Sequence, residues 1–164
     1  MEMLDLVNEQ DEVIGKASRE EVEEKGLLHR VSYVYVHYNG KIIVEKRSSA
    51  KSTRPDYYSV VGETVKSGES FEESALRGVE EEIGLEALNL KKIGKILSLD
   101  EEENDNKIVE LFVCKGKGEI KKQDEEVEEV KLMSKEEIEE FLKTEEKISP
   151  AFRDTFKVYK EAMK

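Results

Sequence analysis

Hydrophobic residues occur along the chain in short runs separated by turn-forming residues, and this pattern predicts several β-strands. The clearest runs cover residues 31–38 and 41–46, which are rich in β-branched and aromatic side chains. Asn39-Gly40 lies between them and is a strong β-hairpin signal. A second hairpin is predicted between residues 4–7 and 12–16, across a polar turn. Further strands are predicted at 57–61, 90–99, 108–115 and 127–133.

Helix signals occur at several places between these strands. Ser18 with Glu21, and Ser134 with Glu137, have the spacing of a capping box. Pro150 stands where the first residue of a helix is expected. The predicted helices cover about residues 19–25, 71–83, 135–142 and 150–163.

The predicted helix at 71–83 has the most informative surroundings. Ser70 and Glu73 form a capping box at its start, and Gly84 has the position of a C′ glycine. Apolar residues recur every fourth position and form one stripe: Phe71, Ala75, Val79 and Ile83. Glu81 and Glu82 lie outside this stripe. Such adjacent carboxylates are either a solvated acidic face or an oxygen-rich site for a hard divalent cation such as Mg²⁺.

The length and the order of elements together predict the architecture. A chain of 164 residues suits one domain with its own core, so we expect residues 1–164 to form a single domain. Strands and helices are interleaved, which predicts a mixed sheet with helices on both faces. The expected fold class is therefore α/β (α+β), in the form of a three-layer α/β/α sandwich.

The charge balance restricts the partners. The chain has 27 basic and 39 acidic residues, a net charge of −12, which argues against a nucleic-acid partner. A phosphate-bearing substrate would need metal ions or local basic residues to offset this charge. The polar segment at 46–56 contains such residues, and Arg47, Lys51 and Arg54 are candidates for binding substrate phosphate. The alternative for this segment is a solvated loop.

The remaining composition favours a cytoplasmic protein. Cys114 is the only cysteine, which excludes an internal disulfide, and its place in a predicted strand favours a buried residue over a nucleophile. No apolar run approaches about 18 residues, and the acidic first residues do not resemble a secretory signal, so no membrane partner is expected. A homodimer is left open.

The segment from Val61 to Leu85 resembles the Nudix box, Gly-x5-Glu-x7-Arg-Glu-U-x-Glu-Glu-x-Gly-U, where U is a bulky aliphatic residue. Its fixed positions are matched by Glu69, Arg77, Glu81, Glu82 and Gly84, and its aliphatic positions by Val79 and Leu85. Glu63 replaces the first glycine of the motif and Gly78 replaces the glutamate after the arginine. The N-terminal segment is also similar to the Nudix subgroup related to isopentenyl-diphosphate isomerase.

The resemblance implies a hydrolase that uses Mg²⁺ or Mn²⁺ to cut the diphosphate of a nucleoside diphosphate linked to another group. It implies that Glu81 and Glu82 are metal ligands and that Arg77 pairs with Glu69 to orient the loop against the helix. A further catalytic carboxylate is expected in a late loop before a strand. Glu126 is the best match, with Glu125 or Glu128 as alternatives.

Gly78 removes one carboxylate from this implied metal platform and costs roughly 1 kcal/mol against alanine inside a helix. We hypothesise that Glu63 reaches the site and replaces the missing ligand. The alternative is that Glu63 points to solvent. An alignment with Gly62 as the motif glycine would need a longer spacer and would not restore a carboxylate at position 78.

Other functions remain open from the sequence. The chain could be a catalytically inactive nucleotide-binding or regulatory protein that kept the fold. Isomerisation of isopentenyl diphosphate is disfavoured, because that chemistry uses a cysteine before the box and residues 54–59 contain none. The tyrosines at 33, 35, 57 and 58 could stack on a base or pack in the sheet.

Overall fold

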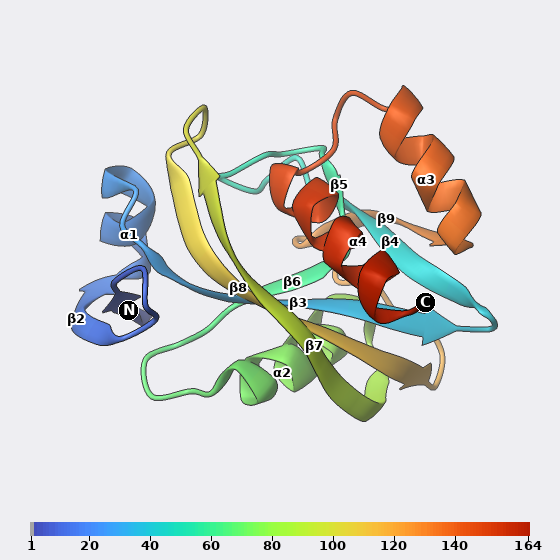
Figure 1. The fold of residues 1–164 in the computed structure, drawn as a ribbon, viewed down its shortest axis with the longest axis horizontal. Coiled ribbons are helices and arrows are strands. Elements are labelled where there is room, and N and C mark those ends of the chain that lie inside the picture. The colour runs from blue at the N-terminus through green and yellow to red at the C-terminus, as the bar shows by residue number, and fades with distance from the viewer. Residues whose placement is uncertain (1) are drawn as a thin grey trace.

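The computed structural model describes residues 2–164, which fold around a mixed β-sheet (Figure 1). The strands of this sheet are β3 (His29–Tyr38), β4 (Lys41–Arg47), β5 (Tyr58–Ser59), β6 (Val61–Thr64), β7 (Glu86–Asp100), β8 (Asp105–Lys117) and β9 (Val127–Met133). Its main order is β5-β4-β3-β8-β7, while β6 pairs with β3 and β9 pairs with β4. The β3–β8 pairing is parallel and the others are antiparallel.

A small N-terminal unit precedes this sheet and lies beside it in Figure 1. It consists of an antiparallel hairpin of β1 (Met3–Val7) and β2 (Val13–Ser18), followed by α1 (Arg19–Lys25). Its own core is formed by Leu4, Ala17 and Val22. The N–H of Ser67 donates to the carbonyl of Met3, which ties the unit to the loop that precedes the helix at 71–83.

Helices cover both faces of the sheet. One face carries α2 (Phe71–Ile83), and the other carries α3 (Lys135–Thr144) and α4 (Pro150–Ala162). Strand β3 alternates between the two cores, with Tyr35 packed under α4 and Val34 packed under α2. The predicted α+β class and its three-layer sandwich with a mixed sheet are therefore confirmed.

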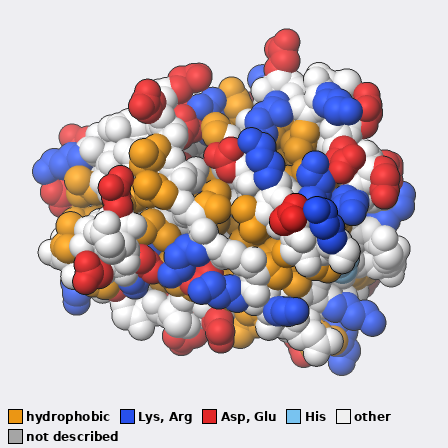
Figure 2. Space-filling view, viewed as in Figure 1, with side chains coloured by type: hydrophobic (Ala, Val, Ile, Leu, Met, Phe, Trp, Pro, Cys, Tyr) orange, Lys and Arg blue, Asp and Glu red, His pale blue; other side chains and the backbone are white. Residues whose placement is uncertain are grey.

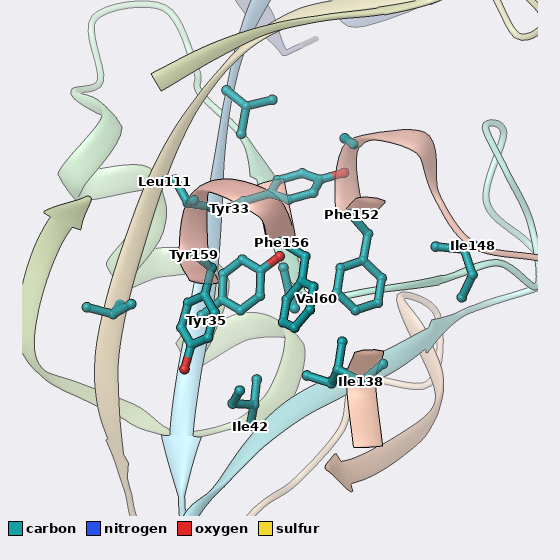
Figure 3. Close-up of a cluster of buried hydrophobic side chains, with 14 of the residues drawn as sticks. Tyr33, Tyr35, Ile42, Val60, Leu111, Ile138, Ile148, Phe152, Phe156 and Tyr159 are labelled. Carbon is teal, nitrogen blue, oxygen red and sulfur yellow. The ribbon is translucent and has the colours of Figure 1, made fainter. Parts of the chain in front are cut away.

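The core under α4 combines aliphatic side chains with a group of aromatic rings (Figure 3). Tyr35 is fully buried and stacks on Tyr159 with ring centroids 4.5 Å apart, and its hydroxyl pairs with the hydroxyl of Thr155 at 2.9 Å. Tyr33 is buried in the same cluster. The Tyr35 ring therefore packs in the core, whereas Tyr33, although largely buried, also lines the pocket described below.

Most predicted elements are present, and the exceptions have a physical reason. The prediction of one strand at 57–61 is wrong, because this segment is divided between β5 and β6 at Val60. The first part pairs with β4 and the second with β3, so the chain crosses from one neighbour to the other at that residue. β7 and β8 are longer than predicted because their antiparallel pairing continues at both ends, from Glu86 with Lys117 to Asp100 with Asp105, beyond the apolar runs.

The surface carries both signs of charge. Figure 2 shows Lys and Arg side chains interspersed with Asp and Glu over one face, with hydrophobic atoms between them. Within residues 2–164, no helix is long and apolar enough to cross a membrane.

Candidate active site

The helix α2 is held at both ends by the residues that the sequence indicates. The Ser70 hydroxyl accepts from the N–H of Glu73, and the Glu73 carboxylate accepts from the N–H of Ser70, which completes the capping box. Gly84 ends the helix in the left-handed conformation with φ 70°, where a Cβ would lie 2.9 Å from the Cβ of Lys121. The position and register of the acidic residues on α2 are thereby set.

Arg77 joins this helix to the preceding loop, as predicted. Its guanidinium donates to both carboxylate oxygens of Glu69 at 2.9 Å and to the carbonyl of Thr64 at 2.8 Å. The same side chain forms ion pairs with Glu63 at 3.3 Å and Glu81 at 3.4 Å, both through Nη1. The Arg77 guanidinium is the main reason that the pKa of Glu69 lies below its usual range. Arg77 therefore fixes the positions of carboxylates on three elements.

Glu81 and Glu82 point in different directions. The side chain of Glu81 is 56% exposed and contacts Arg77, whereas Glu82 is 3% exposed. The expectation that Glu82 lies off the packed face of the helix is wrong, because its side chain turns toward the sheet. Burial, followed by the nearby Glu45, raises the pKa of Glu82 well above its usual value. Glu81 thus lies at the surface of α2, and Glu82 lies in the interior of the protein.

Glu63 points toward Glu82, with which it forms part of one acid group, and not to solvent. Its side chain is 13% exposed and lies within hydrogen-bonding distance of the Glu82 carboxyl group. A Cβ at Gly78 would approach the Cβ of Glu63 to 2.8 Å. Gly78 therefore leaves the space through which Glu63 enters from β6.

Glu45 is a site residue that the sequence analysis missed. It lies on β4, is 4% exposed, and its carboxyl group is within hydrogen-bonding distance of Glu82. Burial raises the pKa of Glu45. Strand alternation could have revealed it, because Glu45 shares a face with Ile43, which is fully buried under α2.

Glu126 lies just before β9 and completes the group from another segment. Its carboxylate pairs with the ammonium of Lys51 at 2.5 Å, and its charge acts on both Glu45 and Glu63. Burial opposes ionisation of Glu126, but the Lys51 ammonium lowers the pKa below its usual value. The structure thus brings the predicted residues Glu126 and Lys51 to the acid group.

A polar pocket of about 70 Å³ opens beside these acids. Its lining includes four carboxylates, Glu23, Glu63, Asp105 and Glu126, and four cations, Arg19, Arg47, Lys51 and Lys107. Arg19, Arg47, Lys51, Glu23 and Glu126 also line a wider groove outside it, of about 510 Å³. The inner pocket and the outer groove therefore share three cations, Arg19, Arg47 and Lys51, which we call the cationic wall, and two carboxylates, Glu23 and Glu126.

Arg47 and Arg54 differ in whether a carboxylate neutralises their charge. Arg47 donates to the backbone carbonyl and hydroxyl of Thr53, and within residues 2–164 it forms no ion pair, so its charge is not neutralised by a carboxylate. Arg54 is 8% exposed and pairs with Asp100 at 2.8 and 3.0 Å. It does not line the pocket beside Glu63. The structure therefore does not bring Arg54 to the predicted phosphate site.

Two cations of the pocket were not predicted. Arg19 reaches it from the N-terminal unit, where it pairs with Glu2 and donates to the hydroxyl of Thr64 on β6. Lys107 comes from β8 and pairs with Asp105 at 2.8 Å. Both lie far in sequence from the basic segment at 46–56, so only the folded chain reveals them.

The donor set suits a hard divalent cation on the ground of its chemistry. Carboxylate oxygens are the ligands that Mg²⁺ and Mn²⁺ prefer, and Oε2 of Glu45 and of Glu82 are buried without a hydrogen-bond partner. Across residues 2–164 no three His, Cys, Asp or Glu side chains converge closely enough to hold a metal by themselves. Mg²⁺ usually keeps several waters and binds one or two carboxylates plus substrate phosphates, so a full protein cage is not required.

Cys114 and His37 lie apart from this site, whereas His29 is buried in the lining of the pocket. Burial raises the pKa of the Cys114 thiol to about 12, in accord with a packing role rather than a nucleophilic one. Nδ1 of His29 lies 2.9 Å from the Leu27 carbonyl, and His37 pairs with the hydroxyl of Tyr159. These contacts support structural roles.

Comparison with known proteins agrees with the fold and the geometry. Residues 27–154 match the NUDIX domain family. The chain therefore belongs to this family, and its class is a Nudix hydrolase of unspecified substrate. The match leaves out the N-terminal unit that supplies Arg19.

Relatives and solved structures extend the comparison over more of the chain. The uncharacterized Nudix hydrolase YfcD of Escherichia coli K12 is 37% identical over 139 residues, which cover 84% of this chain and 76% of that protein. The crystal structure of DR0079 from Deinococcus radiodurans has a TM-score of 0.79 at 22% identity, covering 99% of this chain and 100% of its own. The NUDIX domain of Shewanella oneidensis NrtR, solved with ADP ribose, has a TM-score of 0.66 at 10% identity, covering 84% of this chain and 88% of its own. These structures share the fold.

Proposed function

We propose that this chain is a divalent-cation-dependent hydrolase that cuts the diphosphate of a nucleoside diphosphate linked to another group. The observation that carries the proposal is a buried acid group that adjoins a pocket with a cationic wall. Acids alone would repel a diphosphate, and cations alone would only bind it. Their side-by-side arrangement suits an anion that must be both held and cut.

Each residue has a role in this proposal. Glu63, Glu81 and Glu82 hold Mg²⁺ or Mn²⁺, with Glu126 as the catalytic carboxylate that borders the pocket. The bound cation would neutralise phosphate oxygens and lower the pKa of a water. Arg47 and Lys51, joined by Arg19, bind the phosphates from the cationic wall. Arg77, together with Glu69, positions these acids, and Gly84 ends their helix.

A panel of diphosphates tests this function. ADP ribose belongs in it because the NrtR domain, which shares the fold, was solved with that ligand. Nucleotide sugars, dinucleoside polyphosphates and modified nucleoside triphosphates complete it, each assayed for phosphate products with Mg²⁺ and with Mn²⁺. We expect turnover of at least one member that Glu82→Gln abolishes. Absence of turnover on every member with both metals would reject the proposal.

A second candidate is a nucleotide-binding protein without catalysis. Gly78 in place of a ligand glutamate, and the lack of a complete three-ligand set within residues 2–164, favour it. Gly78→Glu alone would force its Cβ onto Glu63, so the informative variant pairs Glu63→Gly with Gly78→Glu. Hydrolysis that appears only in this double variant would support the binding function, whereas hydrolysis by the parent chain would exclude it.

Several expectations stay predictions. A relation to the isopentenyl-diphosphate isomerase subgroup is one of them, and the relatives named above are described as Nudix hydrolases instead. The single-domain organisation, the cytoplasmic location, the lack of a nucleic-acid partner and the open question of a homodimer are the others.

A further inference from the structure

Glu45 is the single carboxylate of β4, and within residues 2–164 it forms no ion pair. The nearby basic side chains are engaged elsewhere, because Arg47 donates to Thr53 and Lys51 pairs with Glu126. Two other buried acids have a paired cation, Asp100 in Arg54 and Glu110 in Lys92, whereas Glu82, like Glu45, forms no ion pair within residues 2–164. The buried acids without a cation are therefore the two that adjoin each other at this site.

The unpartnered polar atoms of the interior gather at this place. Within residues 2–164, three buried side-chain atoms lack a hydrogen-bond partner: Oε2 of Glu45, Oε2 of Glu82 and Oγ of Ser59. Glu45 and Glu82 adjoin each other, and Ser59 is the direct cross-strand neighbour of Glu45. A buried polar atom without a hydrogen-bond partner destabilises the folded state. Three such atoms at one point indicate a ligand that supplies the missing interactions.

Strands of the sheet place carboxylates near the position where α2 has a glycine instead of a glutamate. Gly78 removes a carboxylate from α2, while Glu63 on β6 enters the space above that glycine. Glu45 on β4 approaches Glu82 from the same sheet. Two carboxylates from neighbouring strands thus face the inner acid of the helix.

We propose that Glu45 on β4 and Glu82 on α2 together bind one divalent cation, next to Glu63, with waters and substrate phosphates as its remaining ligands. The proposal rests on the proposed function only for the identity of the cation as Mg²⁺ or Mn²⁺. It gives Glu45 a ligand role and accounts for its lack of a protein cation. It also explains why position 78 is a glycine, because a side chain there would collide with Glu63.

Mn²⁺ binding to the full chain tests the proposal without reference to activity. Free Mn²⁺ is followed by electron paramagnetic resonance, and thermal unfolding is recorded in EDTA and in Mn²⁺. We expect Glu45→Gln to weaken Mn²⁺ binding at least about tenfold. In EDTA its Tm should match or exceed that of the parent chain, because the Gln amide donates to Glu82 where two carboxylates met before.

Two further variants keep the test decisive. Glu110→Gln changes a strand glutamate of similar burial that pairs with Lys92, and should leave Mn²⁺ affinity unchanged. Glu45→Asp keeps the charge but withdraws it by one methylene, and should weaken binding even if Glu45→Gln does not fold. Mn²⁺ affinity within threefold of the parent chain in both Glu45 variants would overturn the role of Glu45 alone. A parent chain that binds no Mn²⁺ at millimolar concentration would overturn the proposed function as well.

Discussion

Gly78 and Glu63 compete for one small volume between α2 and β6. The distance of 2.8 Å from a Cβ at position 78 to the Cβ of Glu63 is shorter than side chains tolerate. The obstacle is the first carbon of the side chain, which cannot rotate away. The residues at positions 63 and 78 are thus physically linked, because a side chain at position 78 would collide with Glu63.

Gly78→Ala tests this link through stability. In an exposed helix the change would stabilise by about 1 kcal/mol. Here we expect it to destabilise by about 1–3 kcal/mol because the site becomes overpacked. Urea unfolding in EDTA measures the change.

Variants at position 63 supply the matched control for Gly78→Ala. In Glu63→Gly the obstructing Cβ is gone, so Gly78→Ala should become stabilising. In Glu63→Ala the Cβ remains, and Gly78→Ala should stay unfavourable. Equal effects of Gly78→Ala in both backgrounds would contradict the steric explanation.

Arg54 is expected to stabilise the fold rather than to bind phosphate. Glutamine at this position would leave Asp100, which is 8% exposed, without its bidentate partner. We expect Arg54→Gln to lower the free energy of unfolding by about 3 kcal/mol. Binding of ADP, measured by calorimetry on folded protein, should stay close to that of the parent chain.

Arg47→Gln is the matched variant, and should weaken ADP binding with a smaller loss of stability, because Arg47 has no carboxylate partner within residues 2–164. If Arg54→Gln weakened ADP binding as much as Arg47→Gln, the original assignment of Arg54 to the phosphate site would be supported.

At the scale of elements, one arginine joins a loop, a strand and a helix. Arg77 on α2 bonds to Glu69 in the loop and to the carbonyl of Thr64 on β6. A lysine has the charge but not the planar fork that serves both partners. The pair of Arg77 and Glu69 was expected from the resemblance to the Nudix box, whereas the bond to Thr64 required the return of β6 beside α2.

Arg77→Lys should therefore loosen the site more than the fold. We expect a loss of about 1–3 kcal/mol in stability and weaker Mn²⁺ binding, because the carboxylates of Glu63 and Glu81 lose a shared donor. Hydrogen exchange across residues 62–70 should increase.

Arg153 offers a comparable brace elsewhere, since it donates to the carbonyls of Leu142 and Glu145 between α3 and α4. Arg153→Lys should lower stability and leave Mn²⁺ binding unchanged. Equal losses of Mn²⁺ affinity in the two variants would mean that the effect is general destabilisation.

At the scale of the molecule, three acidic side chains gather in the interior, where burial disfavours their charged form. The chain carries −12 overall, and Glu45, Glu63 and Glu82 meet in the interior. A divalent cation bound only by the folded state would relieve this repulsion and stabilise the whole chain.

Mn²⁺ at one hundred times its Kd should add about 2.7 kcal/mol to the free energy of unfolding. For a chain of this length that corresponds to a rise in Tm of about 5–10 °C. Differential scanning calorimetry at constant ionic strength measures it, with Glu82→Gln as the control that should show little rise. An unchanged Tm of the parent chain in millimolar Mn²⁺ would contradict the prediction.

Features that depend on adjacent residues were predicted more accurately than features that depend on contacts between distant segments. The helix at 19–25, the strand at 127–133 and the caps at Ser70 and Gly84 were predicted closely, because each depends on a few adjacent residues. The division of 57–61 into two strands was missed, because it depends on which neighbour each half pairs with. The sequence of a short segment does not indicate which distant strand it will pair with.

The same division applies to the site. Sequence alone determined the loop-and-helix motif, the brace between Arg77 and Glu69, and the acids at 81 and 82, since these lie within one continuous segment. Only the tertiary structure decided that Glu82 turns inward, that Glu45 meets it, that Arg54 faces Asp100, and that Arg19 joins the cationic wall. Spacing along a helix sets which side chains are neighbours on that helix, but contacts between strands and helices arise only when the sheet brings remote segments together.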